Sequence, residues 1–293
     1  MENLMLGIGA EGNGIEYSNN PDPLILMLVF LLSSQVPVIF GVIAILGFIG
    51  NALVVVVVVA NQQMRSTTNL LIINLALADL LFIVFCVPFT ASDYALPFWP
   101  FGEVWCKIVQ YLVIVTAYAS VYTLVLMSLD RYLAVVHPFT SKSIRTKANT
   151  FWAIAVTWVF YSSFFHVDVY LFSSIFRYTF FATSYAIPLL LICALYISML
   201  LRLWKKEAPV GRASAEIQRG KKLRVTRMVC IVVGSFALCC LALFEITPFT
   251  VMIQISSHIL AYMSSCVNPF LYAFISDNFR KAFRKIVYCP RKD

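Results

Sequence analysis

The stretch VIFGVIAILGFIGNALVVVVVVA, residues 38–60, contains no charged side chain, and as one helix it is long enough to cross the ~30 Å hydrocarbon core of a membrane. No ionisable residue occurs anywhere between Asp22 and Arg65. Over all 293 residues, 61% are hydrophobic and only 12% are charged, and the mean hydropathy is +0.85. About a quarter of the residues of a soluble domain are charged, so this composition excludes a soluble globular protein.

Six further apolar runs predict an all-α membrane protein, a bundle of seven transmembrane helices. These runs are 70–89, 108–129, 148–165, 178–201, 228–244 and 246–276. We therefore expect an extracellular N-terminus at 1–37, the bundle at 38–276 and a tail at 277–293. We expect the serines of the apolar segment 24–36, together with Pro37, to interrupt the helix between this segment and the first span. No basic residue precedes it, so we do not expect a signal peptide.

The basic residues predict the orientation of the bundle, because short loops rich in Lys and Arg stay in the cytoplasm. With the N-terminus outside, every Lys and Arg except Lys107 and Arg177 falls on the inner side, and most acids lie outside. The net charge of +8 thus indicates topology, and a nucleic-acid partner is not expected. We predict a multi-pass plasma-membrane protein with a cytoplasmic C-terminus.

Asp79 lies in the middle of the second run, where a carboxylate is costly and usually faces polar partners inside the bundle. Asn51, Ser120, Ser265 and Asn268 are small polar residues of other runs that could surround it, although each could instead bond its own helix. We predict that these five residues form a polar core able to hold a sodium ion as an allosteric modulator. No other cofactor is expected.

Short motifs occur in order, each in a different run or at its end. They are Gly50-Asn51 in the first run, Asp79 in the second, Asp130-Arg131-Tyr132 closing the third, Trp158 in the fourth, Pro188 with Tyr196 in the fifth, and Asn268-Pro269-Phe270-Leu271-Tyr272 in the seventh. Together they resemble the pattern of the rhodopsin-like (class A) G protein-coupled receptors over about residues 38–289.

Three further stretches narrow this resemblance. They are YALPFW at 94–99, SHILAY at 257–262 and SCVNP at 265–269. They resemble the allatostatin A receptors of insects and the related galanin receptors. The resemblance implies a receptor that binds an extracellular, amidated neuropeptide and activates a heterotrimeric G protein of the inhibitory type.

The resemblance also implies a switch for G protein coupling at the inner ends of the helices. Its residues are Asp130, Arg131, Tyr132, Tyr196, Pro269 and Tyr272. Arg131 is expected to pair with its neighbour Asp130 in the resting state, and Tyr196 and Tyr272 are expected to turn toward it in the active state. Pro269 removes a backbone donor and allows its helix to bend.

The sequence on the inner side contains three further features. The heptapeptide FRKAFRK at 279–285 predicts a short amphipathic helix whose bases approach anionic membrane lipid. Cys289, which follows it, is a candidate for palmitoylation or else a free cytosolic thiol. The polar segment 202–227 is the expected contact for the G protein.

Helical spacing predicts a ligand pocket at the outer end of the bundle. Its residues are Gln110, Val113 and Ala117 of the third run, and Gln254, His258 and Tyr262 of the seventh. In the amine-binding receptors of the family that this sequence resembles, an Asp occupies the position of Val113. A small monoamine is therefore not expected as the ligand. His258 could equally be a packing residue. The acidic outer face favours a basic or neutral peptide.

Two departures from the family pattern support an alternative function. No cysteine lies between Cys106 and Cys193, which belongs to the fifth run, so the disulfide that the resemblance implies cannot form in the usual way. The sixth run contains FALCCLA at 236–242, without the Trp and Pro of the family. The alternative is a non-signalling or truncated receptor variant with an impaired ligand response.

Other classes of membrane protein fit the sequence poorly. A secondary transporter would show two repeated halves, which we do not find. An intramembrane enzyme would need a nucleophile with a base or a metal site, but His137, His166 and His258 lie on different segments. We therefore do not expect an enzyme.

Overall fold

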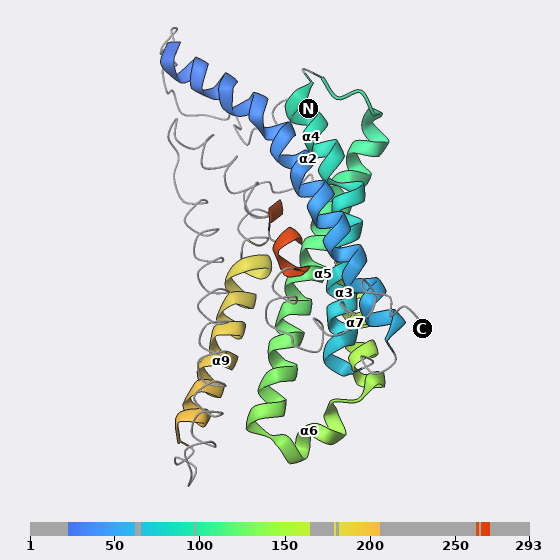
Figure 1. The fold of residues 1–293 in the computed structure, drawn as a ribbon, viewed down its shortest axis with the longest axis vertical. Coiled ribbons are helices and arrows are strands. Elements are labelled where there is room, and N and C mark those ends of the chain that lie inside the picture. Colours follow the sequence, from blue (N-terminus) through green and yellow to red (C-terminus); the bar gives the residue numbers. More distant parts are fainter. Residues whose placement is uncertain are drawn as a thin grey trace, which may run out of the picture.

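The computed structural model describes residues 23–61, 66–96, 98–164, 179, 182–205, 262–263 and 265–269. All regular elements in these residues are helical, which confirms the predicted all-α class (Figure 1). They are α2 (Pro23–Ala60), α3 (Thr67–Phe85), α4 (Val87–Ala95), α5 (Gly102–Val136), α6 (Pro138–Ile144), α7 (Lys147–Phe164), the π-helix η2 (Ala182–Ala186) and α9 (Ile187–Lys205). The sixth predicted run, most of the seventh and the tail at 277–293 lie outside the described residues.

Four segments of the described part are long and apolar enough to cross a membrane. They are Pro37–Ala60, Thr67–Asp93, Gly102–Val136 and Ala182–Arg202. They correspond to the first, second, third and fifth predicted runs. The fourth predicted run, 148–165, coincides with α7 and begins with several polar residues, which lower its mean hydropathy.

The first helix differs from the prediction, because α2 begins at Pro23 and continues through Pro37 without interruption. The predicted break between segment 24–36 and the first span is therefore wrong. A continuous helix satisfies backbone groups that have no water to bind, and one proline removes only one hydrogen bond. The second predicted run, in contrast, forms α3 and α4, which meet at Cys86, with Pro88 in the first turn of α4.

α5 is the central helix of the described bundle. It contacts α3 and α7 on one side and α9 on the other, while α2 packs against α3 and α4 (Figure 1). α5 ends at Val136, so the motif Asp130-Arg131-Tyr132 lies inside its last two turns and does not close the helix. The short helix α6 then carries the chain back toward α3.

Apolar side chains lie on both faces of the spanning helices. On α2, Phe40, Val54 and Val57 are buried, whereas Ile45 is 62% exposed and Ile49 is 59% exposed. A soluble helix would carry polar residues on its outer face. The exposed face of α2 is thus suited to contact lipid.

Two apolar clusters hold α2 and α3 together at different depths. One contains Val54, Val57 and Leu75 and adjoins Met127 of α5. The other contains Phe40 and Phe82 together with residues 262 and 266 of the seventh segment. Asn51 and Asp79 lie between these clusters along their helices, so two apolar layers enclose the polar groups.

Candidate functional site

Asp79 lies on α3 and is only 1% exposed. The Oγ of Ser120 on α5 donates to Asp79 Oδ1 at 3.2 Å, and the Nδ2 of Asn268 donates to Asp79 Oδ2 at 2.9 Å. The side chain of Ser265 also hydrogen-bonds to this carboxyl. The fold thus brings together groups from segments that are far apart in sequence.

Asn51 completes this polar core from α2. Its Nδ2 donates to the backbone oxygens of Gly47 and Ser265, each at 2.9 Å. Its Oδ1 is buried and accepts no hydrogen bond from the described residues. All five residues predicted for the polar core therefore lie at one place in the structure.

Two glycines on α2 allow the seventh segment to approach this closely. A Cβ atom added at Gly47 would lie 2.6 Å from the Cδ1 of Ile83 and 2.9 Å from the Sγ of Cys266. One added at Gly50 would lie 3.0 Å from the ring of Pro269. A side chain at Gly47 would therefore require Ile83 and Cys266 to move.

The polar core presents oxygen atoms, which are hard ligands. The described side chains that surround the carboxyl of Asp79 are uncharged. The carboxyl of Asp79 accepts from hydroxyls and an amide, and no Lys or Arg of the described residues pairs with it. A buried carboxylate of this kind is compensated by several donors, by a cation or by a proton. Carboxylate, hydroxyl and carbonyl oxygens are the ligands that hard cations prefer.

A second polar network, centred on Asn74, joins three helices. The Nδ2 of Asn74 donates to the Oγ1 of Thr123 on α5 at 2.7 Å, and the Nε1 of Trp158 on α7 donates to the Oδ1 of Asn74 at 2.9 Å. Sequence reasoning singled out Trp158 but missed Asn74. The signal was present, since an amide inside the leucine-rich run of α3 needs partners just as Asp79 does.

Asp130, near the C-terminal end of α5, is held by an arginine that sequence reasoning did not select. Its Oδ1 accepts from the Nε of Arg145 at 2.6 Å and its Oδ2 from the Nη2 of the same residue at 3.0 Å. The Oγ1 of Thr68 also donates to Oδ2 at 2.6 Å. Asp130 is 8% exposed, and its hydrogen bond raises the pKa of Arg145.

The resting-state pair between Asp130 and Arg131 that the sequence predicts is not the arrangement in this structure, where Asp130 pairs with Arg145. Consecutive residues of a helix do not face each other, so the two side chains point in different directions. Arg131 is exposed, whereas α6 turns the chain so that Arg145 reaches the carboxylate. A partner fifteen positions away is thus closer in space than the neighbour.

Tyr196 lies on α9 and is 2% exposed. It packs with Ile192 and Met199 against Tyr132, and its side chain hydrogen-bonds to Ser128 of α5. This contact joins the C-terminal halves of α5 and α9.

A group of tyrosines joins α5 and α7 to the π-helix η2, and sequence reasoning missed it. The hydroxyl of Tyr122 donates to the backbone oxygen of Thr183 at 3.0 Å, and that of Tyr118 lies 2.7 Å from the Oγ1 of Thr183. The ring of Tyr161 stacks on Tyr118 with centroids 4.3 Å apart. The spacing of Tyr118 and Tyr122, one helical turn apart, was the available signal.

The family model of the seven-transmembrane receptors of the rhodopsin family matches residues 50–272, which include the polar core and the partners of Asp130. The chain belongs to this family. The receptor is 55% identical to the allatostatin-A receptor of Bombyx mori, over 90% of its own length and 82% of that relative's.

The receptor is also similar to vertebrate proteins. It is 39% identical to galanin receptor type 2 of Mus musculus over 86% of its own length and 75% of the relative's, and 37% identical to galanin receptor type 3 of Homo sapiens over 88% and 79%. The resemblance indicated by the motifs and the seven-helix architecture predicted from the apolar runs are thus confirmed. The receptor is a multi-pass plasma-membrane protein.

The structure places part of the predicted ligand pocket of the receptor. Tyr262 is 8% exposed and packs against Phe40 and Phe82, with ring centroids 4.8 and 4.7 Å apart. Its hydroxyl lies 3.0 Å from the Oγ1 of Thr90. Val113 packs against the same cluster. Tyr262 thus belongs to the apolar layer above the polar core.

The structure describes some of the other residues that the sequence singled out. Gln110 and Ala117 lie on α5 and are partly buried. Cys106 is a free thiol near the N-terminal end of that helix. The remaining positions, Gln254, His258, Tyr272 and Cys289, lie outside the described residues, as do segments 206–227 and 236–242.

Proposed function

We propose that this receptor binds an amidated neuropeptide of the allatostatin A or galanin type at the outer end of its bundle and activates a heterotrimeric G protein of the inhibitory type. The observation that carries the proposal is the 55% identity, over 90% of the chain, to a protein named allatostatin-A receptor. That likeness favours a signalling receptor over the non-signalling variant considered from the sequence.

The packing of Tyr262 supports a peptide site at the outer end. Tyr262 is held between aromatic rings and by Thr90, and Val113 lies against the same cluster. A ligand above this cluster that pressed on it would press on the layer that covers Asp79. Such contact would connect peptide binding with the polar core.

The inner end of α5 supports the coupling proposal. Arg131 is exposed there, and Asp130 is occupied by Arg145 and Thr68. The side chain of Arg131 is therefore available to bind a backbone carbonyl of a G protein without first leaving an ion pair with Asp130. Tyr196, buried beside Ser128, would turn toward Arg131 in the active state.

Nucleotide exchange on purified receptor tests this mechanism. Receptor in lipid nanodiscs is mixed with an inhibitory-type heterotrimer and an amidated peptide, and the same peptide with a free carboxyl end is the ligand control. Arg131→Ala should abolish stimulated exchange, and Lys142→Gln, which removes an exposed charge nearby, should leave it within about twofold. Unaltered exchange in Arg131→Ala would contradict the coupling mechanism.

We further propose that the N-terminus lies outside the cell. The distribution of Lys and Arg supports this orientation. An epitope at each end of the chain, stained on intact cells, distinguishes the two orientations. Labelling of the C-terminal epitope alone would reverse the proposal.

We also propose that the polar core binds sodium. The unpartnered Oδ1 of Asn51 and the carboxyl of Asp79, with neutral donors around it, support a small hard cation at this place. Sodium should then raise the thermal stability of the receptor relative to choline at equal ionic strength.

A further inference from the structure

Pro188, just after the π-helix η2, removes the backbone donor for one carbonyl of that helix. In a π-helix the N–H of each residue bonds to the carbonyl five positions earlier. In this register the donor for the carbonyl of Thr183 would be residue 188, and a proline has no N–H. A carbonyl without a partner is costly inside a membrane, because no water is there to bind it. A donor from another helix therefore stabilises η2.

The hydroxyl of Tyr122 on α5 is such a donor. It donates to the backbone oxygen of Thr183 at 3.0 Å. The ring of Tyr161 on α7 lies against that of Tyr122, with centroids 4.9 Å apart, and the two side chains are hydrogen-bonded. Because the proton of Tyr122 is used on Thr183, Tyr161 is the donor in this second bond. Two helices thus act together on one carbonyl of η2.

Tyr118, one helical turn before Tyr122, contacts the same threonine in a different way. Its hydroxyl lies 2.7 Å from the Oγ1 of Thr183, and that Oγ1 donates to the backbone oxygen of Thr179 at 2.7 Å. A threonine hydroxyl has a single proton, so Tyr118 is the donor. Tyr118 therefore binds the side chain of Thr183 while Tyr122 binds its backbone, which makes Tyr118 a matched control for Tyr122.

The register of η2 decides which of its side chains face the bundle. A π-helical turn contains one residue more than an α-helical turn, and one residue corresponds to a rotation of about 100° about the helix axis. In the register of this structure Thr183 faces the tyrosines of α5, and the next residue, Ser184, is 1% exposed. If η2 became α-helical, its N-terminal end would turn by that angle relative to α9.

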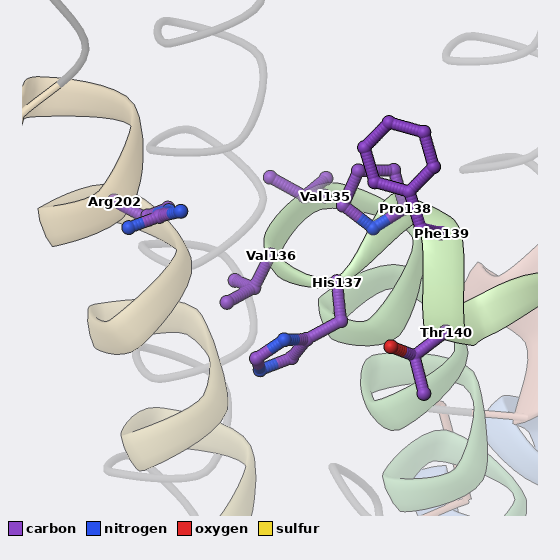
Figure 2. Close-up of a pocket in the computed structure, with 7 residues that line it drawn as sticks. All are labelled: Val135, Val136, His137, Pro138, Phe139, Thr140 and Arg202. Carbon is purple, nitrogen blue, oxygen red and sulfur yellow. The ribbon is translucent and has the colours of Figure 1, made fainter.

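The opposite end of α9 leaves space beside α5. Arg202 and the residues that end α5 line a pocket of about 290 Å³ there. Figure 2 shows Arg202 extending from α9 toward Val136 and His137. Close packing of this last turn therefore contributes little to fixing the rotation of α9 about its axis, and the hydrogen bonds at η2 contribute more.

We propose that Tyr122 is a positioning residue for the peptide pocket. Its hydroxyl replaces the N–H that Pro188 lacks and holds η2 in the π-helical register. It thereby fixes how the outer end of the span Ala182–Arg202 is rotated where the peptide binds. The role toward the peptide rests on the proposed function, whereas the replacement of the missing donor does not.

A double-mutant cycle tests the replacement of the donor. Tyr122→Phe removes only the hydroxyl and should lower the melting temperature of the receptor in nanodiscs by about 2 °C, the effect of one hydrogen bond. Pro188→Ala returns a backbone N–H, so in that background Tyr122→Phe should cost less than half as much. Tyr118→Phe should lower the melting temperature equally in both backgrounds. Equal losses for Tyr122→Phe in the two backgrounds would overturn the proposal.

Amide hydrogen exchange provides a measurement that does not need the Pro188→Ala variant. Mass spectrometry of the fragments that cover 182–190 should show exchange about threefold faster in Tyr122→Phe than in the unmodified receptor, because η2 is held less firmly. Tyr118→Phe should accelerate exchange less. Equal acceleration in the two variants would contradict a particular role for the bond to the backbone and would also overturn the proposal.

Peptide binding tests the positioning role. Tyr122→Phe should raise the Kd of an amidated peptide of the allatostatin A type about fivefold, and Tyr118→Phe should raise it less than twofold. An unaltered Kd in Tyr122→Phe would overturn the role at the peptide pocket. If the unmodified receptor binds no amidated peptide, the proposed function and this role fail together, whereas the melting temperatures and exchange rates still decide whether Tyr122 replaces the missing donor.

Discussion

Asp79 and Asp130 are two buried carboxylates of one bundle, and the fold compensates them in different ways. Asp79, 1% exposed, accepts hydrogen bonds only from the neutral side chains of Ser120, Ser265 and Asn268 in the described residues. Asp130, 8% exposed, accepts two hydrogen bonds from Arg145 as well as one from Thr68.

The difference follows from depth. Asp130 lies near the end of a span, where the long basic side chain of Arg145, the residue after α6, can reach it while remaining 28% exposed. Asp79 lies between two apolar layers, where a protein cation would itself need burial. A carboxylate without a protein cation beside it is suited to bind a cation from solution reversibly. A carboxylate in an ion pair with the protein is suited to hold a loop in place.

The largest effect is expected when the Asp79 carboxyl is removed altogether. Asp79→Ala should lower the free energy of unfolding by about 1–3 kcal/mol, because Ser120 and Asn268 would be left as partly buried donors without this acceptor. Thermal unfolding in choline chloride measures this. Asp93→Ala, at the less buried end of α4, is the control and should cost about 0.5 kcal/mol or less.

Replacing each carboxylate with a neutral amide of nearly the same size distinguishes a site that binds a free cation from a fixed ion pair. Asp79→Asn should abolish the stabilisation by sodium over choline, because the anion that attracts the ion is gone. Asp130→Asn should leave that stabilisation intact. If the unmodified receptor melts at one temperature in both salts, the polar core does not bind sodium.

The ion pair itself should contribute a smaller amount. Asp130→Asn and Arg145→Gln are each expected to destabilise the receptor by about 1–2 kcal/mol, because a charge-assisted pair of hydrogen bonds is lost. The double variant should cost little more than either one, which a double-mutant cycle would reveal. Additive losses would mean that the two side chains do not act as a pair. Lys142→Gln serves as the control and should have no measurable effect.

The smallest effect distinguishes two adjacent threonines. The Thr68 Oγ1 donates to Asp130 at 2.6 Å, while that of Thr67 is 3.4 Å from the same carboxyl. Thr68→Val should therefore cost about 1 kcal/mol and Thr67→Val about half of that or less. Chemical denaturation of both variants in one detergent checks this, and equal losses would contradict the hydrogen bonding described.

Much of the fold followed from local sequence. Uncharged runs such as 38–60 predicted spans because a backbone in hydrocarbon must satisfy its own hydrogen bonds, which a helix does. Asp79 could be selected alone, because its cost in a span does not depend on which partners it finds. The short motifs then indicated the family that the match over 50–272 confirms.

Local sequence was less informative where the partner of a residue could be either adjacent in sequence or distant in sequence and close in space. It could not predict that α2 starts at Pro23, since serines and one proline can be accommodated within a membrane helix. It placed Asp130 with Arg131, although adjacent helical residues diverge by about 100°.

The sequence by itself thus determined the class of fold, the membrane spans and the residues whose polarity requires partners. The tertiary structure decided which partners they have. Asp130 pairs with Arg145 because α6 turns the chain back, and Asn51 reaches the seventh segment because Gly47 and Gly50 leave room for it. Polarity is a property of one residue, but a hydrogen bond requires two groups at about 3 Å, and only the packing of helices sets that distance.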